Sequence, residues 1–425
     1  MSNTNYEVIV VGAGLAGLSA ANLLHEKGLH FKVIEASSRP GGKVKSVKRD
    51  DSERSFELGA QFINTDMEEM VKWIKRAGLE LCETKIPPRP AEMIYPGKKE
   101  ISEAIDQHEE QFEEIKVQID KQDERLSDLY DRLSLSHDEK QVVTSIYKEL
   151  INIDPQEVSA RAVLDLTYRF PSEQDDLTHQ VWNPLADLVH FMEKELADHI
   201  MYQEPIVEIQ ETQSGYKLVS GENSYNANAV IMAVPPAVAS RITYSSSLEK
   251  CYRRALNSYK NGAIIKTTWV YDHPFWHDYE VEGQNRGIMD VVYTDPQGVT
   301  VSDSSKEGGE HRLTMFIGAN TAEELANERR DQQMETALSW LEDVFGKEAL
   351  TFKDAEQSVW VKDEYCGGGY GAGIKYGELP NAAEVLRTPS GRFAFASSEL
   401  SEQFPYFMEG AIRAGQAAVS RTLGE

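Results

Sequence analysis

Hydrophobic and polar positions near the start of the chain predict a strand, a helix and a second strand, in that order. Residues 6–11 read YEVIVV, a β-branched run typical of a buried strand. A helical pattern follows over 18–27, and Gly28 stands where a helix commonly ends. Residues 30–36, HFKVIEA, then give a second strand pattern, which closes on Glu35.

One long amphipathic helix is predicted over 101–133. Apolar residues follow a three–four alternation there, while acidic residues crowd the other faces. Two interpretations stay open for this helix. It is either packed in a substrate domain with one solvated face, which we favour, or paired with a partner chain in a coiled coil. Helical patterns continue to about Arg169.

The rest of the chain alternates between strand and helix patterns without an internal repeat. The predicted elements are a helix over 184–199, a hairpin over 205–219 that turns at Ser214 and Gly215, strands over 229–234, 264–271, 288–293 and 313–317, and a helix over 322–345 that starts with a capping box at Thr321 and Glu324 and ends at Gly346. This order indicates a chain that weaves between two domains.

Length and composition agree with two packed domains. The 425 residues exceed what one small core organises, and hydrophobic residues make up 40% of the chain and aromatic residues 9%. This apolar content excludes a wholly disordered chain.

Charge and cysteine usage exclude several classes of function. The formal net charge of −26 disfavours nucleic acid and anionic membranes as partners, because their phosphates would be repelled. The three cysteines, Cys82, Cys251 and Cys366, have no metal-ligand spacing, so we expect no metal site, and their small number fits a reducing compartment. We see no secretory signal and no apolar window of about 18 residues, and therefore predict a cytoplasmic protein without a membrane span.

The turn between the first strand and the first helix has the composition of a dinucleotide-binding loop. Gly12 permits a tight turn, Gly14 lets a pyrophosphate approach the backbone, and Gly17 allows the helix to pack closely on the strand. The helix N-terminus offers its unpaired N–H groups and its dipole to phosphates. Glu35 can accept hydrogen bonds from the ribose hydroxyls of an adenosine.

Two further segments favour an extended cofactor. Both NAD and FAD fit the first motif. Residues 39–43, RPGGK, and 57–62, ELGAQF, add a second glycine pair and a basic side chain soon after the ribose-binding acid. This arrangement favours contacts along a long dinucleotide over a glycine-rich surface loop.

Motifs spread from residue 8 to residue 416 resemble those of the flavin-containing amine oxidases, which include monoamine and polyamine oxidases. The motifs are GAGLAGLSAA, EASSRPGG, VIMAVPP, DEYCGGGY and GRFAFASSELSEQFPYFMEGAIRAGQ. The resemblance implies an α/β fold, in which a Rossmann-like FAD-binding domain built from three segments is interleaved with an α+β substrate domain (a mixed sheet plus helices). The implied FAD-binding segments are 1–77, 179–258 and 358–425, and the implied substrate-domain segments are 78–178 and 259–357.

The same resemblance implies which residues bind FAD. Val207 matches the position whose backbone meets the adenine, and Glu399 and Met408 match positions at the flavin end. Members with covalent flavin carry a cysteine where this chain has Gly369, so we expect non-covalent FAD. The implied FAD-binding residues are Gly12, Gly14, Leu15, Ala16, Gly17, Glu35, Ala36, Arg39, Gly42, Lys43, Gly59, Ala60, Gln61, Phe62, Val207, Glu399 and Met408.

Four residues match the catalytic positions of that family. By this resemblance, Tyr370 and Phe407 form two walls of an aromatic cage on the substrate face of the flavin, and Trp360 stacks at the ring edge. Lys266 stands in a strand pattern that resembles the segment whose lysine holds a water at the flavin N5. A buried lysine has a lowered pKa, so it could order water, relay a proton and help oxygen accept electrons.

The implied reaction is the oxidation of a small or medium amine. A hydride passes from the carbon beside nitrogen to the flavin N5, O2 reoxidises the flavin and gives peroxide, and the imine hydrolyses. The chain departs from the family pattern with Lys43 for arginine, Phe407 for tyrosine and SSE over 397–399 for Gly-Thr-Glu.

These departures leave two alternatives open. One is a flavin dehydrogenase or desaturase on the same fold that uses another electron acceptor. The other is a catalytically weak flavin scaffold that binds a partner through the helix over 101–133. The oligomeric state also stays open, with a homodimer as one option.

Overall fold

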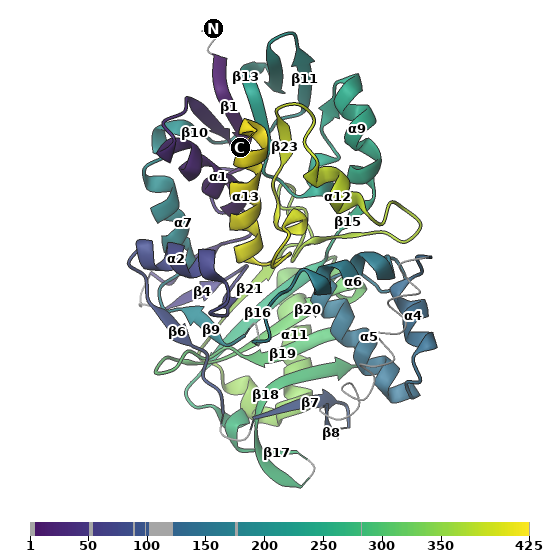
Figure 1. Ribbon diagram of the computed structural model, residues 1–425. Helices are drawn as coiled ribbons and strands as arrows, with labels where there is room; N and C mark the ends of the chain where they lie inside the picture. The colour runs from purple at the N-terminus through teal and green to yellow at the C-terminus, as the bar shows by residue number, and fades with distance from the viewer. Residues whose placement is uncertain are drawn as a thin grey trace.

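Two large β-sheets, one above the other in Figure 1, organise the chain. The computed structural model describes residues 5–50, 54–87, 90–97, 99–101, 122–174, 177–281 and 283–424. The first strand, β1 (Asn5–Val11), and the last helix, α13 (Met408–Leu423), both lie in the upper half of the molecule (Figure 1).

The first sheet takes its strands from three separate stretches of sequence. Besides β1 these are β2 (Phe31–Ile34), β10 (Ile200–Met201), β11 (Glu208–Thr212), β12 (Gly215–Ser220), β13 (Asn223–Met232), β14 (Thr243–Tyr244) and β23 (Phe393–Phe395). Their order is β10-β2-β1-β13-β12-β11-β14, with β23 paired to β13. The pairs β10–β2, β2–β1, β1–β13 and β13–β23 are parallel, whereas β12 runs antiparallel to both of its neighbours.

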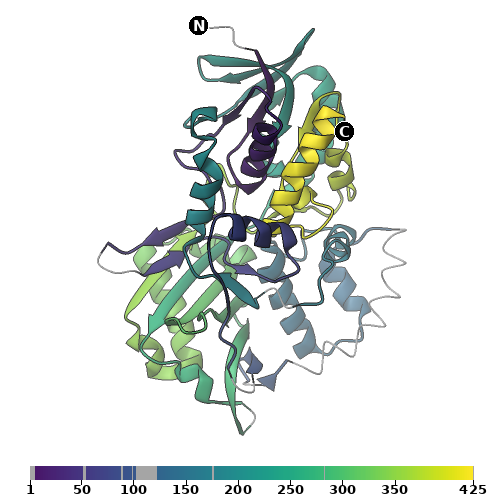
Figure 2. The ribbon, with the colours of Figure 1, turned by 60° about the vertical axis from the view of Figure 1, so that its left-hand side comes forward.

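Helices cover both faces of this sheet (Figures 1 and 2). One core contains α1 (Leu15–Glu26), α2 (Glu68–Arg76), α7 (Leu185–Lys194) and α13, and the other contains α8 (Pro236–Ala239), α9 (Ser246–Asn257) and α12 (Ala382–Arg387). Val8 and Val10 of β1 enter the first core, and Ile9 and Val11 enter the second. Burial on both faces explains why this strand reads as a continuous apolar run instead of an alternating one.

The second sheet combines an early hairpin with strands from later in the chain. Its members are β7 (Pro90–Tyr95), β8 (Lys99–Glu100), β16 (Ile264–Tyr271), β17 (Tyr279–Val281), β18 (Gln284–Thr294), β19 (Gln297–Asp303), β20 (His311–Gly318) and β21 (Asp354–Val359). The order is β21-β16-β20-β19-β18-β7-β8, with β17 paired to β18.

One face of the second sheet packs on α10 (Ala319–Leu325) and α11 (Arg330–Phe345). In β16, Ile265 and Trp269 enter the core on that face. Side chains of successive strand residues point to opposite faces. Ile264 and Lys266, which flank Ile265 in β16, therefore point away from α10 and α11, towards the first sheet.

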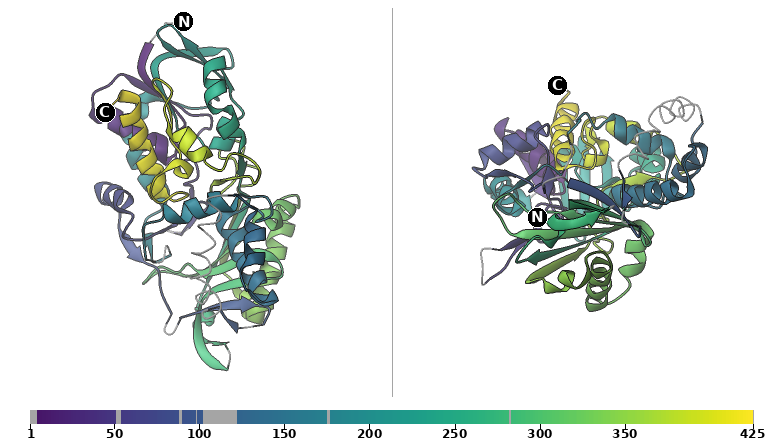
Figure 3. Two further views of the ribbon diagram at one scale, coloured as in Figure 1. Left: turned by 45° about the vertical axis from the view of Figure 1, so that its right-hand side comes forward. Right: turned by 90° about the horizontal axis from the view of Figure 1, so that it is seen from below.

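Three helices form a smaller core beside the second sheet (Figure 3). They are α4 (Leu126–Arg132), α5 (His137–Ile151) and α6 (Ala160–Tyr168). The remaining elements are β3 (Ser46–Lys48) with β4 (Ser55–Glu57), β5 (Phe62–Ile63) with β9 (His179–Val181) and β6 (Leu81–Glu83), β15 (Tyr259–Asn261) with β22 (Ala372–Ile374), and the 3₁₀ turns η2 (Ala197–His199), η3 (Phe275–Asp278), η4 (Gly346–Thr351) and η5 (Ser398–Leu400).

Most predicted elements are confirmed, with shifted ends. The helix predicted over 184–199 ends already at Lys194, and the strand predicted over 229–234 begins earlier, at Asn223. β16 has the bounds predicted from the sequence. The first helix begins at Leu15 and not at Leu18, because Gly14 is its N-cap residue. The hairpin of β11 and β12 turns at residues 213–214, one position earlier than predicted.

The single continuous helix predicted over 101–133 is wrong at residues 122–125, which are not helical, whereas α4 follows and ends at Arg132, close to the predicted end. Residues 102–121 lie outside the described residues. The chain is extended at Arg125, and α4 begins only after it. The cause is a tertiary contact, because the Asp123 carboxylate accepts a hydrogen bond from Ser159 Oγ (2.9 Å) at the start of α6.

The helix predicted over 322–345 is two helices, separated at residues 326–329. The expected capping box does not form, because Thr321 lies inside α10 and its hydroxyl donates to Gln297 O (2.6 Å). Gly346 ends α11 as predicted, with a φ of +69°. None of the helices in the described part of the chain is both long enough and apolar enough to cross a lipid bilayer.

Candidate active site

A cavity of about 1240 Å³ lies where the two large sheets face each other, and α5 and α6 also contribute to its walls. Pockets for drug-sized ligands measure roughly 300–1,000 Å³. The cavity therefore has room for a large cofactor together with a small substrate.

The predicted site residues line this cavity with one exception, Gly17. The first half of the chain supplies Gly12, Gly14, Leu15, Ala16, Glu35, Ala36, Arg39, Gly42, Lys43, Gly59, Ala60, Gln61, Phe62 and Val207. The second half supplies Lys266, Trp360, Tyr370, Glu399, Phe407 and Met408. Residues almost 400 positions apart in the sequence thus meet around one space.

Three glycines at the start of α1 have different surroundings. A Cβ on Gly12, whose φ is +101°, would lie 2.6 Å from Ala233 O, and a Cβ on Gly17 would lie 1.9 Å from Gly12 O. Gly12 and Gly17 therefore serve the packing of strand against helix. A Cβ on Gly14 would meet only Gly42 Cα, at 3.9 Å, so this position opens onto the cavity. Gly14 caps α1 without a side-chain hydrogen bond, which leaves first-turn N–H groups to a ligand.

Glu35 is buried at the end of β2 and lines the cavity beside this turn. Its carboxylate accepts hydrogen bonds from Ala13 N (2.6 Å), Ser37 N (2.7 Å) and Ser37 Oγ (2.7 Å). One donor lies in the glycine turn and the other two belong to the loop after β2, and together they fix the carboxylate where a ribose hydroxyl could donate to it.

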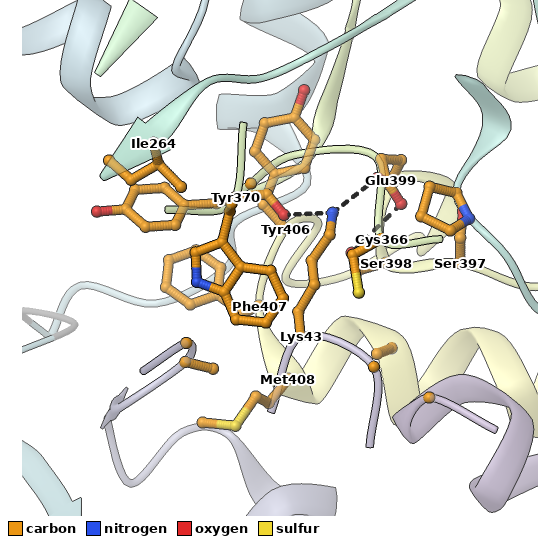
Figure 4. A pocket seen from close by; sticks show the side chains of 18 of the residues that line it. Lys43, Ile264, Cys366, Tyr370, Ser397, Ser398, Glu399, Tyr406, Phe407 and Met408 are labelled. Atoms are coloured by element: carbon orange, nitrogen blue, oxygen red, sulfur yellow. Dashed lines mark hydrogen bonds and ion pairs between the residues drawn. The ribbon is translucent and has the colours of Figure 1, made fainter. Parts of the chain in front are cut away.

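Two basic side chains after Glu35 have different roles. The Arg39 guanidinium donates to the backbone oxygens of its own loop, including Gly42 O (2.6 Å). Lys43 Nζ instead donates to Tyr370 O (2.8 Å) and lies 4.0 Å from the Glu399 carboxylate (Figure 4). Lys43 thus joins the glycine-rich loop to two segments from the C-terminal part of the chain.

The aromatic residues predicted at the site come from separate elements. Trp360 belongs to a small apolar cluster with Phe316, and Tyr370 packs against that cluster, with its ring edge-on to Phe316 at 6.2 Å between centroids. Phe407 is the N-cap residue of α13, and the centroid of its ring lies 5.2 Å from the centroid of the Phe170 ring.

Hydrogen bonds hold two of these aromatic side chains. Trp360 Nε1 donates to Leu58 O (2.7 Å), and the Tyr370 hydroxyl donates to the Glu149 carboxylate (2.7 Å). The rings are therefore fixed at their polar atoms as well as by packing.

Lys266 is buried, with a side chain in the cavity wall. Its Nζ donates to Gln61 Oε1 (2.6 Å) and Gly59 O (3.0 Å), and lies 5.7 Å from the centroid of the Phe316 ring. Burial lowers the pKa of Lys266 to about 7, although the nearby carboxylate of Glu57 acts in the opposite direction. The Glu57 carboxyl is also buried, and burial raises its pKa.

Sequence reasoning missed the acidic residues of the cavity wall. They include Glu92 of β7, Glu149 of α5 and Asp290 of β18, and Thr300 and Ser302 of β19 add hydroxyls. The cavity is lined by Glu173, Glu204, Asp363 and Glu364 as well. The signal for Asp290 was a lone carboxylate within an otherwise apolar strand pattern. For Glu149 no local signal existed, because an acid on an amphipathic helix is normally solvated.

The comparisons with known proteins agree with this geometry. The family model for flavin containing amine oxidoreductases matches residues 15–423. The chain is 24% identical over 460 residues to the amine oxidase [flavin-containing] of Danio rerio, covering 98% of this chain and 86% of that protein. It is 25% identical over 456 residues to the amine oxidase [flavin-containing] B of Homo sapiens, covering 100% and 87%.

Solved structures show the same fold. A cyclohexylamine oxidase from Brevibacterium oxydans IH-35A matches with a TM-score of 0.85 at 21% identity, covering 99% of both chains. A wild-type putrescine oxidase bound to putrescine matches with a TM-score of 0.86 at 21% identity, covering 99% of this chain and 100% of that one. The chain belongs to the family of flavin-containing amine oxidoreductases. Its fold is the expected one, with a Rossmann-like flavin-binding domain interleaved with a substrate domain.

Proposed function

We propose that this flavin-dependent oxidoreductase binds FAD non-covalently, oxidises a small or medium amine, and passes the electrons to O2. One observation carries the proposal. A single cavity joins an uncapped, glycine-lined helix N-terminus beside Glu35 to a buried lysine beside aromatic side chains. The first feature fits the adenosine and pyrophosphate of FAD, and the second fits a flavin ring with an amine against it.

The residues around the glycine turn fit FAD in particular. The open space over Gly14 admits a pyrophosphate, and the fixed Glu35 carboxylate can accept from ribose hydroxyls while it disfavours a 2′-phosphate. Val207 is exposed at the cavity wall, where its backbone could meet the adenine.

Two observations support non-covalent attachment. Gly369, which precedes Tyr370, offers no thiol. The nearest cysteine in sequence, Cys366, is buried, and burial raises the pKa of its thiol to about 12, so it carries little thiolate at neutral pH. Acid precipitation should release the flavin into the supernatant, whereas colour retained in the pellet would contradict this part of the proposal.

FAD would supply the redox chemistry: acceptance of a hydride from the carbon beside an amine nitrogen, which leaves an imine that water hydrolyses, and transfer of two electrons to oxygen, which gives hydrogen peroxide. The chain supplies the surroundings of this chemistry. Tyr370, Phe407 and Trp360 offer apolar, rigid walls that exclude water and attract a partly positive nitrogen. Lys266 Nζ holds a proton, or an ordered water, at the cavity wall.

Carboxylates in the wall favour amines among the small molecules that could enter. Glu92, Glu149 and Asp290 line the same cavity as Lys266, and their charge would raise the local concentration of a cationic amine. We infer that the substrate arrives as an ammonium ion and loses its proton inside.

An anaerobic screen of primary, secondary and polyamines tests the proposal, with flavin absorbance as the readout. We expect at least one amine to bleach the flavin, and peroxide to form when air is readmitted. Bleaching without peroxide would favour the dehydrogenase alternative, and no bleaching with any amine would overturn amine oxidation.

The scaffold alternative depends on the helix over 101–133, and residues 102–121 lie outside the described residues. No observation on the described residues favours it. The cytoplasmic location and the homodimer stay predictions from the sequence.

A further inference from the structure

Behind Lys266, a chain of amide side chains runs away from the cavity into the protein. Lys266 Nζ donates to Gln61 Oε1 (2.6 Å), and Gln61 Nε2 donates to Gln180 Oε1 (2.8 Å). Gln180 Nε2 in turn donates to Ser304 O (3.2 Å) and Thr84 Oγ1 (3.1 Å). The exposed fractions are 4% for Lys266, 8% for Gln61 and 0% for Gln180, so the chain is shielded from solvent.

The direction of these hydrogen bonds is set at the buried end. Ser304 O is a backbone carbonyl, which can only accept, so Gln180 must present its NH₂ group there and its oxygen to Gln61. Gln61 must then present its own NH₂ group to Gln180 and its oxygen to Lys266. One main-chain carbonyl thereby fixes the orientation of both amides, which an isolated glutamine would leave open.

The amine is consequently held by two acceptors, Gln61 Oε1 and Gly59 O. A lysine ammonium has three N–H donors in a tetrahedral arrangement. With two of them committed, one position is left, and Lys266 lines the cavity. In the ammonium form that position carries an N–H, and in the neutral amine it carries the lone pair.

We propose that Gln180, acting through Gln61, is a positioning residue that restricts proton exchange at Lys266 to the single position of its amine that faces the cavity. The proposal rests on the proposed function, in which Lys266 holds a proton or a water for the reaction. Gln180 belongs neither to the family motifs nor to the residues that line the cavity. It is wholly buried in β9, which pairs with β5 on one side and β6 on the other.

The charged groups around Lys266 change its proton affinity, whereas the amides of Gln61 and Gln180 orient its amine. Glu57 of β4 raises the pKa of Lys266, and Arg312 of β20 and Lys306 lower it, whereas burial is the largest influence. Glu57 is itself held by Ser46 Oγ (2.7 Å) and Leu185 N (3.0 Å). The uncharged amides add a directional acceptor, which favours the ammonium form because hydrogen bonds to the charged state stabilise it.

The test measures the protonation of Lys266 directly, in the full-length protein with its flavin and without any amine. Trace labelling with acetic anhydride at a series of pH values, read by peptide mass spectrometry, gives the pH midpoint of Lys266 reactivity, because only the neutral amine reacts. The variants are Gln180→Leu, which removes the acceptor for Gln61, and Gln180→Glu, which retains it. A carboxyl at position 180 accepts from Gln61 in either protonation state, and when protonated it also donates to Ser304 O.

The matched control is Gln357→Leu. Gln357 is a buried glutamine of β21 whose Nε2 donates to Thr267 Oγ1 (3.0 Å), one residue from Lys266 on the opposite face of β16. We expect Gln180→Leu to lower the Lys266 midpoint by about one pH unit, Gln180→Glu to leave it unchanged or raise it, and Gln357→Leu to leave it unchanged.

Equal midpoints in the wild-type and Gln180→Leu proteins, with the flavin retained, would overturn the proposal. A shift of the same sign in Gln180→Leu and Gln180→Glu, or a comparable shift in Gln357→Leu, would also overturn it, because general loosening of the core would then explain the effect. If Gln180→Leu does not fold, the sign of the Gln180→Glu shift decides, and a downward shift counts against the proposal. Because no substrate is present, the labelling result stands even if no amine reduces the flavin, and the two failures are thereby distinguished.

Discussion

At the glycine turn after β1 the cavity is bounded by backbone, whereas the second sheet meets the cavity with side chains. At the first sheet, Gly14 and the N–H groups of α1 face the cavity, and only Glu35 adds a buried charged side chain at the turn. At the second sheet, Lys266, Phe316 and Asp290 project from three different strands. The two halves of the site therefore tolerate change in different ways. The half at the glycine turn, which we call the backbone half, depends on the absence of side chains. The half at the second sheet, which we call the side-chain half, depends on which side chains are present.

The largest expected effect distinguishes Gly17 from Gly14, two glycines of the backbone half. Gly17→Ala should lower the free energy of unfolding by about 3 kcal/mol and lose the flavin, because the new Cβ would lie 1.9 Å from Gly12 O and neither backbone can give way. Gly14→Ala should keep its stability, since its φ of −70° suits alanine and its Cβ would meet only Gly42 Cα at 3.9 Å.

Gly14→Ala should nevertheless bind FAD roughly tenfold or more weakly, because the added methyl group occupies the space through which the pyrophosphate approaches the backbone. Urea unfolding and flavin fluorescence titration measure the two properties separately. If Gly14→Ala were as destabilised as Gly17→Ala, the distinction between a packing glycine and a ligand-facing glycine would fail.

The same contrast explains how much the sequence could predict. The β1–α1–β2 unit was predictable because glycines at fixed spacing and a strand-terminal acid lie within one short stretch, and local backbone geometry decides their arrangement. Lys266 and Tyr370 were identified only through a resemblance, since alternation alone makes a lysine in a strand an outward residue.

Other features depend on tertiary contacts that no local pattern encodes. Gln180 stands in a three-residue strand, and its orientation comes from Ser304, 124 positions away. The expected helix over 101–133 is not continuous at residues 122–125, where Asp123 accepts a hydrogen bond from Ser159. In both cases a polar side chain found its partner far along the chain, which periodicity cannot reveal.

The second largest effect tests Lys266, the buried lysine of the side-chain half. Lys266→Met should slow amine oxidation or flavin reoxidation by about 100-fold, the usual range for a proton-transfer group, with the flavin retained. Stopped-flow absorbance under anaerobic and aerobic conditions separates the two half-reactions. Lys48→Met, at an exposed lysine of β3, is the control and should behave as wild type. Unchanged kinetics in Lys266→Met would remove this residue from the mechanism.

A third expectation concerns stability against pH, and its sign follows from the lowered pKa of Lys266. In the folded protein this pKa is about 7, against an unperturbed value of 10.5, so between these values the unfolded chain binds more protons. Stability attributable to Lys266 should therefore rise with pH through this window. Relative to Lys266→Met, the wild type should gain about 2 kcal/mol in the free energy of unfolding between pH 7 and pH 9. Urea unfolding at the two pH values measures this difference in the free energy of unfolding. A decrease between pH 7 and pH 9 would contradict a neutral buried amine at Lys266.

The smallest effect concerns the link between Tyr370 and Glu149, two side chains that line the cavity and are joined by a hydrogen bond. Tyr370→Phe keeps the ring against Phe316 but removes the hydroxyl that donates to Glu149 at 2.7 Å. Loss of one such hydrogen bond costs about 1 kcal/mol, so kcat/KM should fall roughly fivefold, far less than for Tyr370→Ala. Glu149→Gln retains an acceptor for the hydroxyl and removes the charge, which allows a double-mutant cycle on kcat/KM. A coupling energy near zero would mean that the carboxylate does not hold the ring and that packing alone sets its position.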